Sequence, residues 1–249
     1  MRLCAIEVVH PRVACVRHRA FLSCSYVART ELGFALIDSG MAVDGAPMCA
    51  GIEALGGRVE DLRWILLTHW HNDHTAGAAA LAAKSGAAVL HAPRALEHFT
   101  PGRRRLRHRI AERIPEFGPF ALLKGIVGQA PPRPLAITGH IDEGDVVAGE
   151  IEVLATPGHS IEHLSFWWPS QRVLFAGDAL AVCGGRISYM SRALTQDVAA
   201  AHASMRRLLE LDAALICPGH RRPLTRDVDG HRTAALRDLA ARRRWPLFS

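Results

Sequence analysis

The chain lacks any apolar run long enough to cross a bilayer. A membrane-spanning helix needs about 20 consecutive apolar residues, and no stretch of the sequence approaches that length. The first residues, Met1 to Glu7, carry a charge inside what would be the apolar region of a signal peptide. We therefore expect no membrane partner and no signal peptide.

Cysteine pairs with the spacing of a metal or redox motif are also missing. None of the six cysteines forms a C-x-x-C pair, and most lie in apolar segments. This usage predicts reduced, buried thiols and a cytoplasmic location. Cys217 lies three residues before His220 and could ligate a metal, but its apolar strand favours a buried structural role. The six are Cys4, Cys15, Cys24, Cys49, Cys183 and Cys217.

Aromatic residues are scarce, and none is interleaved with the basic clusters. The net charge of +6 comes largely from Arg103–Arg109 and Arg242–Arg244. Nucleic-acid-binding surfaces usually combine such charge with aromatic side chains that stack on bases. We therefore interpret both clusters as solvated faces and expect no nucleic-acid partner, although the first cluster could attract an anionic substrate.

Histidine, in contrast, is concentrated in the segment Thr68-His69-Trp70-His71-Asn72-Asp73-His74. Imidazole and carboxylate are ligands that zinc and related divalent metals prefer. Trp64–Thr68 predicts a buried strand, and an extended continuation would project His69 and His71 to one side. The sequence from Asp73 onward predicts a helix, so Asp73 and His74 should leave in another direction. The segment therefore predicts two pairs of ligands for two neighbouring metals.

Further ligand-type residues follow other predicted strands. Ile151–Ala155 leads through a Pro-Gly turn to His159, and Ala213–Cys217 leads through a second Pro-Gly turn to His220. Asp178 follows another apolar run. A single histidine near a strand end is usually packed or solvated, but the whole set together favours a metal centre.

The remaining histidines receive weaker assignments. His163 is predicted to support the site from behind or to pack in the core. His91 and His140 fall near predicted strand ends and could face the site. The others are predicted to be solvated: His10, His18, His98, His108, His202 and His231.

The order of predicted elements indicates mixed sheets covered by helices on both faces. A 249-residue chain with ordinary apolar content is consistent with a single domain, residues 1–249. Strands are predicted at 3–9, 12–17, 23–29, 33–38, 64–68, 87–91, 136–140, 151–155, 164–168, 173–177 and 213–217. Helices are predicted at 46–56, 74–85, 197–210 and 229–244.

With these motifs, the chain resembles the metallo-β-lactamase-fold hydrolases, from Asp38-Ser39-Gly40 to His220. The resemblance implies an αββα sandwich of two mixed β-sheets. It also implies that His69, His71 and His159 bind one metal and that Asp73, His74 and His220 bind a second. Asp178 would bridge the two. The expected cofactors are two divalent ions, zinc first, with iron or manganese as alternatives.

Such a centre implies a hydrolytic mechanism. Two ions about 3.5–4 Å apart can share a water and generate hydroxide near neutral pH, which attacks a carbonyl or phosphoryl group. Asp73 would orient this nucleophile and, by the resemblance, act as the catalytic residue that passes a proton to the leaving group. The expected partner is a small-molecule substrate.

One region interrupts the predicted alternation of strands and helices. Residues 99–134 predict a helical insertion, with an Arg-rich start and the breaker run Pro131–Pro134 at its end. In the metallo-β-lactamase-fold hydrolases that the chain resembles, insertions often lie over the metals and shape the substrate pocket. The alternatives are a surface helix pair or a homodimer contact.

Differences within the family narrow the function. Asp178 disfavours a true β-lactamase, and His71 disfavours the di-iron oxygen reductases. Ala181 stands where acyl-homoserine lactonases have Tyr. Tyr189 could take the place of that Tyr in space. Residues 177–186 loosely resemble glyoxalase II and persulfide dioxygenases. The interpretation is a dinuclear hydrolase of an ester-like carbonyl: a lactone, thioester or amide. The alternatives are a mononuclear-iron persulfide dioxygenase, a β-lactam or phosphodiester hydrolase, and a binding protein without turnover.

Overall fold

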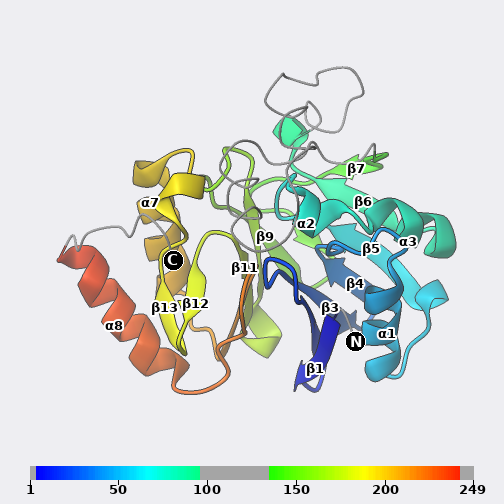
Figure 1. Cartoon of the computed structure of the whole chain (residues 1–249), viewed down its shortest axis with the longest axis horizontal. Coiled ribbons are helices and arrows are strands. Elements are labelled where there is room, and N and C mark those ends of the chain that lie inside the picture. The colour runs from blue at the N-terminus through cyan, green and yellow to red at the C-terminus, as the bar shows by residue number, and fades with distance from the viewer. Residues whose placement is uncertain (1–3, 96–134, 242–249) are drawn as a thin grey trace.

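The computed structural model describes residues 4–95 and 135–241. Two β-sheets lie face to face, with helices on both outer faces (Figure 1). This confirms the predicted αββα sandwich. Within the described ranges no helix is long and apolar enough to cross a membrane. The assignment of residues 1–249 to one domain stays a prediction, and the predicted insertion at 99–134 lies outside the described residues.

The first sheet has the order β1-β2-β3-β4-β5-β6-β7. Its strands are β1 (Cys4–His10), β2 (Val13–His18), β3 (Cys24–Thr30), β4 (Gly33–Ile37), β5 (Leu62–Leu66), β6 (Ala88–His91) and β7 (Gly139–His140). The second sheet has the order β14-β11-β10-β9-β8. Its strands are β14 (Leu215–Pro218), β11 (Val173–Gly177), β10 (Leu164–Trp168), β9 (Ile151–Ala155) and β8 (Val146–Val147).

Helices cover each sheet on the side away from the other sheet (Figure 1). The first sheet carries α1 (Ala46–Ala54) and α3 (Ala78–Ser85), and the second carries α7 (Val198–Glu210) and α8 (Val228–Ala240). The single-turn α2 (Asn72–Thr75) follows β5, and the hairpin of β12 (Ala181–Cys183) and β13 (Arg186–Ser188) stands apart from both sheets. Short 3-10 turns lie at Val59–Asp61, Pro93–Ala95, Pro169–Gln171 and Arg192–Leu194.

Alternation along the buried strands divides the apolar residues among three core layers. On β11, Phe175 points between the sheets while Leu174 packs toward α7 and α8. Phe175 pairs with Phe166 of β10 and lies with its ring 5.7 Å from that of Tyr26 of the first sheet. Because both faces of these strands are covered, their sequences are continuously apolar rather than alternating.

The predicted helix at 74–85 is divided in the structure. The His74 carbonyl accepts hydrogen bonds from the Ser39 N–H and hydroxyl, at 2.7 and 3.0 Å, and the Gly77 N–H donates to the Gly40 carbonyl. These tertiary bonds replace the helical bond that Ala78 would have made, so α2 ends before α3 begins. The prediction of one continuous helix was therefore wrong at this point. The β12–β13 hairpin was not predicted at all.

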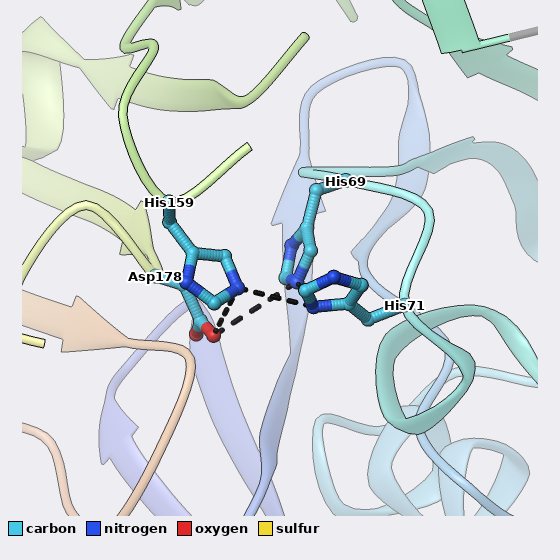
Figure 2. Close-up of side chains that lie close together, drawn as sticks. All are labelled: His69, His71, His159 and Asp178. Atoms are coloured by element: carbon cyan, nitrogen blue, oxygen red, sulfur yellow. Dashed lines mark hydrogen bonds and ion pairs between the residues drawn. The ribbon is translucent and has the colours of Figure 1, made fainter. Parts of the chain in front are cut away.

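Strand direction places the site. In the second sheet β11 and β14 are parallel, and β9 and β11 are both antiparallel to β10, so β9, β11 and β14 run the same way. In the first sheet β5 is parallel to β4 and β6. The segments that follow β5, β9, β11 and β14 meet at one edge of the sandwich (Figures 1 and 2).

We predict that Phe166→Ala lowers the free energy of unfolding by about 3–5 kcal/mol, because it opens a cavity between the two sheets. Phe166 is fully buried there. Urea unfolding followed by circular dichroism measures the change. The control is Leu32→Ala, at a side chain that is 61% exposed, where the change should stay within about 0.5 kcal/mol. Equal losses in the two variants would contradict this view of the core.

Candidate metal centre

All seven predicted ligands lie together in the structure. Their side chains form two groups in which the potential ligand atoms lie within 4.8 Å of one another. The first group consists of His69, His71, His159 and Asp178, and the second of Asp73, His74 and His220. Apart from Asp178, which the resemblance implied as a bridge, the residues are divided as the resemblance implied.

The first group is buried, and its imidazoles point toward one another (Figure 2). His69 Nε2 lies 2.8 Å from His71 Nδ1, which in turn lies 3.0 Å from His159 Nε2. Asp178 Oδ2 closes the group at 3.2 Å from His159 Nε2. Strand β5 ends at Leu66, two residues before the end of the predicted strand, and His69 and His71 lie in the loop that follows it.

The second group is less enclosed. The His74 and His220 Nε2 atoms are 3.4 Å apart, and Asp73 Oδ2 lies 3.4 Å from the first and 3.5 Å from the second. The side chains of Asp73 and His220 are 19% and 18% exposed, whereas that of His74 is fully buried. Solvent therefore reaches the centre from the side of Asp73 and His220.

Asp178 lies between the two groups. Its Oδ2 is 3.2 Å from His159 Nε2 of the first group and 3.3 Å from His220 Nε2 of the second. Its Oδ1 is 3.7 Å from His74 Nε2 and has no hydrogen-bond partner within the described part of the chain. This is the position that a carboxylate bridging two cations needs.

Three of the histidines are held from behind, so that the same nitrogen of each ring faces the centre. The Thr68 hydroxyl donates to Asp38 and therefore accepts from His69 Nδ1–H at 2.9 Å. His74 Nδ1–H donates to Asp38 Oδ2 at 2.8 Å, and His220 Nδ1–H donates to the Phe21 carbonyl at 2.9 Å. Each bond leaves the Nε2 lone pair free to bind a metal.

Backbone without side chains makes room for the carboxylate and for the His159 turn. A Cβ on Gly219 would lie 2.1 Å from Asp178 Oδ1, so only glycine lets β14 pass so close to the centre. Gly158 has φ 145°, and a Cβ there would lie 2.4 Å from the Ala201 backbone of α7. The Pro-Gly turns predicted before His159 and His220 therefore serve close approach as well as chain reversal.

Burial controls the protonation of the first group. It lowers the pKa of His69 and of His71 well below the usual range, and neighbouring histidines push in the same direction. Burial also lowers the pKa of His159. All three imidazoles are therefore neutral at pH 7, which is the form that binds a metal.

Carboxylates control the second group. Burial would lower the pKa of His220, but Asp178 and Asp73 outweigh it and raise that pKa to about 9. Burial is likewise outweighed at His74, whose pKa Asp73 and Asp38 raise well above the usual range. Although burial would raise the pKa of both carboxyl groups, the histidines lower those of Asp73 and Asp178. Cationic imidazoles thus neutralise these carboxylates in the metal-free chain.

The donor set fits two divalent cations. Three neutral imidazole nitrogens converge on one point, two more converge on a second, and a buried carboxylate with an unpaired oxygen lies between them. Nitrogen and carboxylate oxygen in this arrangement suit zinc, iron or manganese. Cys217 is fully buried in the core between the sheets, as predicted for a structural thiol.

Sequence reasoning missed the supporting role of Asp38 and the burial of His18. Asp38 was singled out only as part of a turn, yet it is 1% exposed and anchors His74. The signal was present, because Asp38 stands at the end of the predicted strand at 33–38. His18 was predicted to be solvated, which was wrong: it is 5% exposed, with Nδ1 at 3.1 Å from Cys4 Sγ. His18 is the last residue of β2, and the apolar run Val13–Val16 at the start of that strand was the available signal.

The other candidates divide between burial and exposure. His91 is fully buried at the end of β6, whereas His140 is exposed. Tyr189, considered as a replacement for the lactonase tyrosine, is buried in the core layer of α7 and α8, with its ring 5.3 Å from that of His202. His163 is fully enclosed behind the first group, which confirms its predicted supporting or packing position.

Solved structures of known proteins resemble this one. A metallo-beta-lactamase family protein of Thermus thermophilus matches with a TM-score of 0.61 at 24% identity, covering 94% of this chain and 81% of that one. TTHA1623, solved in a di-iron-bound form, matches with a TM-score of 0.63 at 26% identity, covering 87% of this chain and 96% of that one.

Curated relatives share sequence as well. A hydroxyacylglutathione hydrolase of Acidiphilium cryptum is 31% identical over 71% of this chain and 56% of its own length. One of Rhodospirillum rubrum is 29% identical over 81% of this chain and 64% of its own length. The chain thus spans little more than half of the first of these relatives. The family model of the metallo-beta-lactamase superfamily matches residues 19–220, which include every residue of both ligand groups. The chain therefore belongs to the metallo-beta-lactamase superfamily.

Proposed function

We propose that this protein is a dinuclear metal-dependent hydrolase that cleaves an ester-like carbonyl bond, with a thioester as the first candidate. The observation that carries the proposal is the position of Asp178, whose carboxylate contacts both ligand groups. His69, His71 and His159 would hold one divalent ion, and Asp73, His74 and His220 the other. When bound, such ions lower the pKa of a water toward about 7 and polarise a carbonyl oxygen.

The chain's own residues contribute position and charge. Asp38 orients the ring of His74, and the Phe21 carbonyl orients that of His220. The histidines of the second group are therefore oriented by hydrogen bonds, as His69 is in the first. Asp73 remains ionised because neighbouring imidazoles lower its pKa. Its carboxylate lies on the solvent-reached side, where it can orient an attacking water and carry a proton to the leaving group.

The choice of thioester is supported by the relatives. The names of the Acidiphilium and Rhodospirillum proteins denote hydrolysis of a hydroxyacylglutathione, which is a thioester. A lactone or an amide presents the same carbonyl to the same centre, so both remain in the proposed class. The expected partner is accordingly a small molecule. The homodimer contact and the cytoplasmic location stay predictions.

The metals are proposed to be zinc, with iron as the first alternative. The di-iron form of TTHA1623 supports two metals as well as iron. A mononuclear-iron persulfide dioxygenase would leave the second group without a purpose, although that group carries its own anchors. The β-lactam and phosphodiester alternatives use the same centre and are separated from the proposal by substrate rather than by ligands.

Metal analysis and a substrate panel test the function. We expect about two metal ions per chain, with hydrolysis of an S-acylglutathione or a lactone exceeding that of a cephalosporin or a bis-aryl phosphodiester. Dialysis against a chelator should abolish the activity, and zinc should restore it. One iron per chain with oxygen uptake on a persulfide would support the dioxygenase. Two metals without turnover on any substrate would support a binding protein.

Variants at the ligands extend this test. Asp178→Asn and His159→Ala should each lower kcat/KM more than about 100-fold, because even groups that only support a ligand cost 10–100-fold. The control is Arg186→Ala, on the exposed side of β13, which should leave metal content unchanged. Activity that survives both ligand substitutions would exclude the metal mechanism.

Proton release tests the difference between the two groups. In the metal-free chain at pH 7 the three imidazoles of the first group are neutral, whereas His220, with a pKa of about 9, and His74 hold protons. We expect the first ion to bind with little proton release and the second to release about one to two protons. The affinity for the second ion should therefore rise as pH increases toward 9.

Calorimetric titrations in buffers of different ionisation enthalpy measure these protons. His220→Asn should release about one proton fewer than the unmodified chain. A second binding step that releases none, or an affinity that falls as pH increases, would contradict this assignment of charge.

A further inference from the structure

A series of buried hydrogen bonds, called the circuit below, lies behind the first ligand group. The Asp178 N–H donates to His163 Nε2 at 2.9 Å, and His163 Nδ1 lies 2.8 Å from the Thr156 hydroxyl. That hydroxyl lies 2.8 Å from the hydroxyl of Ser165, which donates to the Ala176 carbonyl at 3.0 Å. The circuit thus begins and ends on the strand end that carries Asp178.

The two ends of the circuit determine every proton in it. A main-chain N–H can only donate and a carbonyl can only accept. The Ser165 hydroxyl uses its one proton on Ala176, so it must accept from Thr156. Thr156 has then used its own proton, so it must accept from His163 Nδ1–H. His163 is therefore neutral and carries its proton on Nδ1.

His163 cannot itself be a metal ligand in this arrangement. Its Nε2 lone pair is occupied by the Asp178 N–H, and its Nδ1 is protonated. Its ring centre is 5.3 Å from that of His69 and 6.4 Å from that of His159. Burial, with His159 beside it, lowers the pKa of His163 to about 3, which agrees with a neutral ring.

The start of β10 also connects the segments that bear ligands. The Thr156 N–H donates to the His163 carbonyl at 2.9 Å, at the root of the His159 turn. The Leu164 N–H donates to the Thr68 carbonyl at 2.8 Å, directly before His69. Together with the bond to Asp178, residues 163 and 164 therefore contact the segments of three ligands, although β10 supplies none.

We propose that His163 is a positioning residue of the metal centre. Held in its Nδ1–H form by Thr156 and Ser165, it fixes the main chain of Asp178 and thereby places the bridging carboxylate relative to His159. This inference rests on the proposed dinuclear function, since the carboxylate needs this placement only if two ions share it. The expected effect of breaking the circuit is a loss of metal affinity of about 10–100-fold.

The test removes the one acceptor of the His163 proton. Thr156→Val keeps the shape of the side chain but leaves His163 Nδ1–H buried without a partner. Thr156→Ser retains the hydroxyl, and its zinc affinity should stay within about threefold of that of the unmodified chain. The zinc affinity of Thr156→Val should fall about 10–100-fold. Ser165→Ala, which opens the circuit one step further on, serves as a second variant if Thr156→Val does not fold.

Thr30→Val provides the matched control. Thr30 is a buried threonine at the end of β3, remote from the centre, and among the described residues its hydroxyl bonds local main chain. Thr30→Val should lower the midpoint of thermal unfolding as Thr156→Val does. It should leave the zinc affinity and the visible spectrum of the cobalt-substituted protein unchanged. A general loss of stability is thereby separated from a loss of placement.

Three readouts are needed. Competition with a chromogenic chelator gives zinc affinity, the visible spectrum of the cobalt-substituted protein reports ligand geometry, and histidine ¹⁵N NMR reports the tautomer of His163, assigned by its loss in His163→Gln. We expect the His163 ring to carry its proton on Nδ1, and none on Nε2, in both the metal-free and the zinc-loaded protein. A charged or Nε2–H ring, or Thr156→Val with unchanged affinity and spectrum, would overturn the proposal. If the unmodified chain binds no zinc, iron or manganese, the proposed function itself fails.

Discussion

The metal centre depends first on the buried carboxylate of Asp38. It accepts from the Thr68 N–H and hydroxyl and from His74 Nδ1–H, while Thr68 in turn accepts from His69. One carboxylate thus orients one histidine in each ligand group. Support also crosses between the layers, because His220, which follows a strand of the second sheet, is oriented by the Phe21 carbonyl in a loop of the first.

The metal centre lowers the stability of the fold when no cation is bound. The centre gathers five imidazoles and two carboxylates at an edge where most of them are buried. Without cations, the second group must retain protons to balance its carboxylates, and Asp178 Oδ1 has no hydrogen-bond partner in the described part of the chain. Such an arrangement is unfavourable for folding alone. It becomes favourable when cations replace the protons, so folding and metal binding are linked.

The sequence alone predicted which residues gather at this edge, because they lie in segments that follow apolar strands, and the carboxyl ends of strands that run in the same direction meet at one edge of a sheet. The supports were harder to predict. The bonds from Asp38 to His74 and from Asp178 to His163 join segments that only the folded chain brings together. The break between α2 and α3 has the same origin, because Ser39 takes the His74 carbonyl away from the helix. Local propensity has no information about such competition.

The exposed side of the centre adjoins the loop between β2 and β3, which holds one of the ligands. Of the seven residues, Asp73 and His220 have side chains nearly one-fifth exposed, so solvent reaches the centre through the second group. His220 is oriented by the Phe21 carbonyl, and the Arg221 N–H bonds the Leu22 carbonyl, so the loop between β2 and β3 both holds a ligand and borders the approach. Phe21 and Leu22 have positive φ angles, 54° and 53°, and their apolar side chains are each 39% exposed. Backbone strain of this kind persists only where surrounding contacts hold it. Here the contacts include that of the Phe21 carbonyl with His220, so a change in this loop would alter the orientation of that ring.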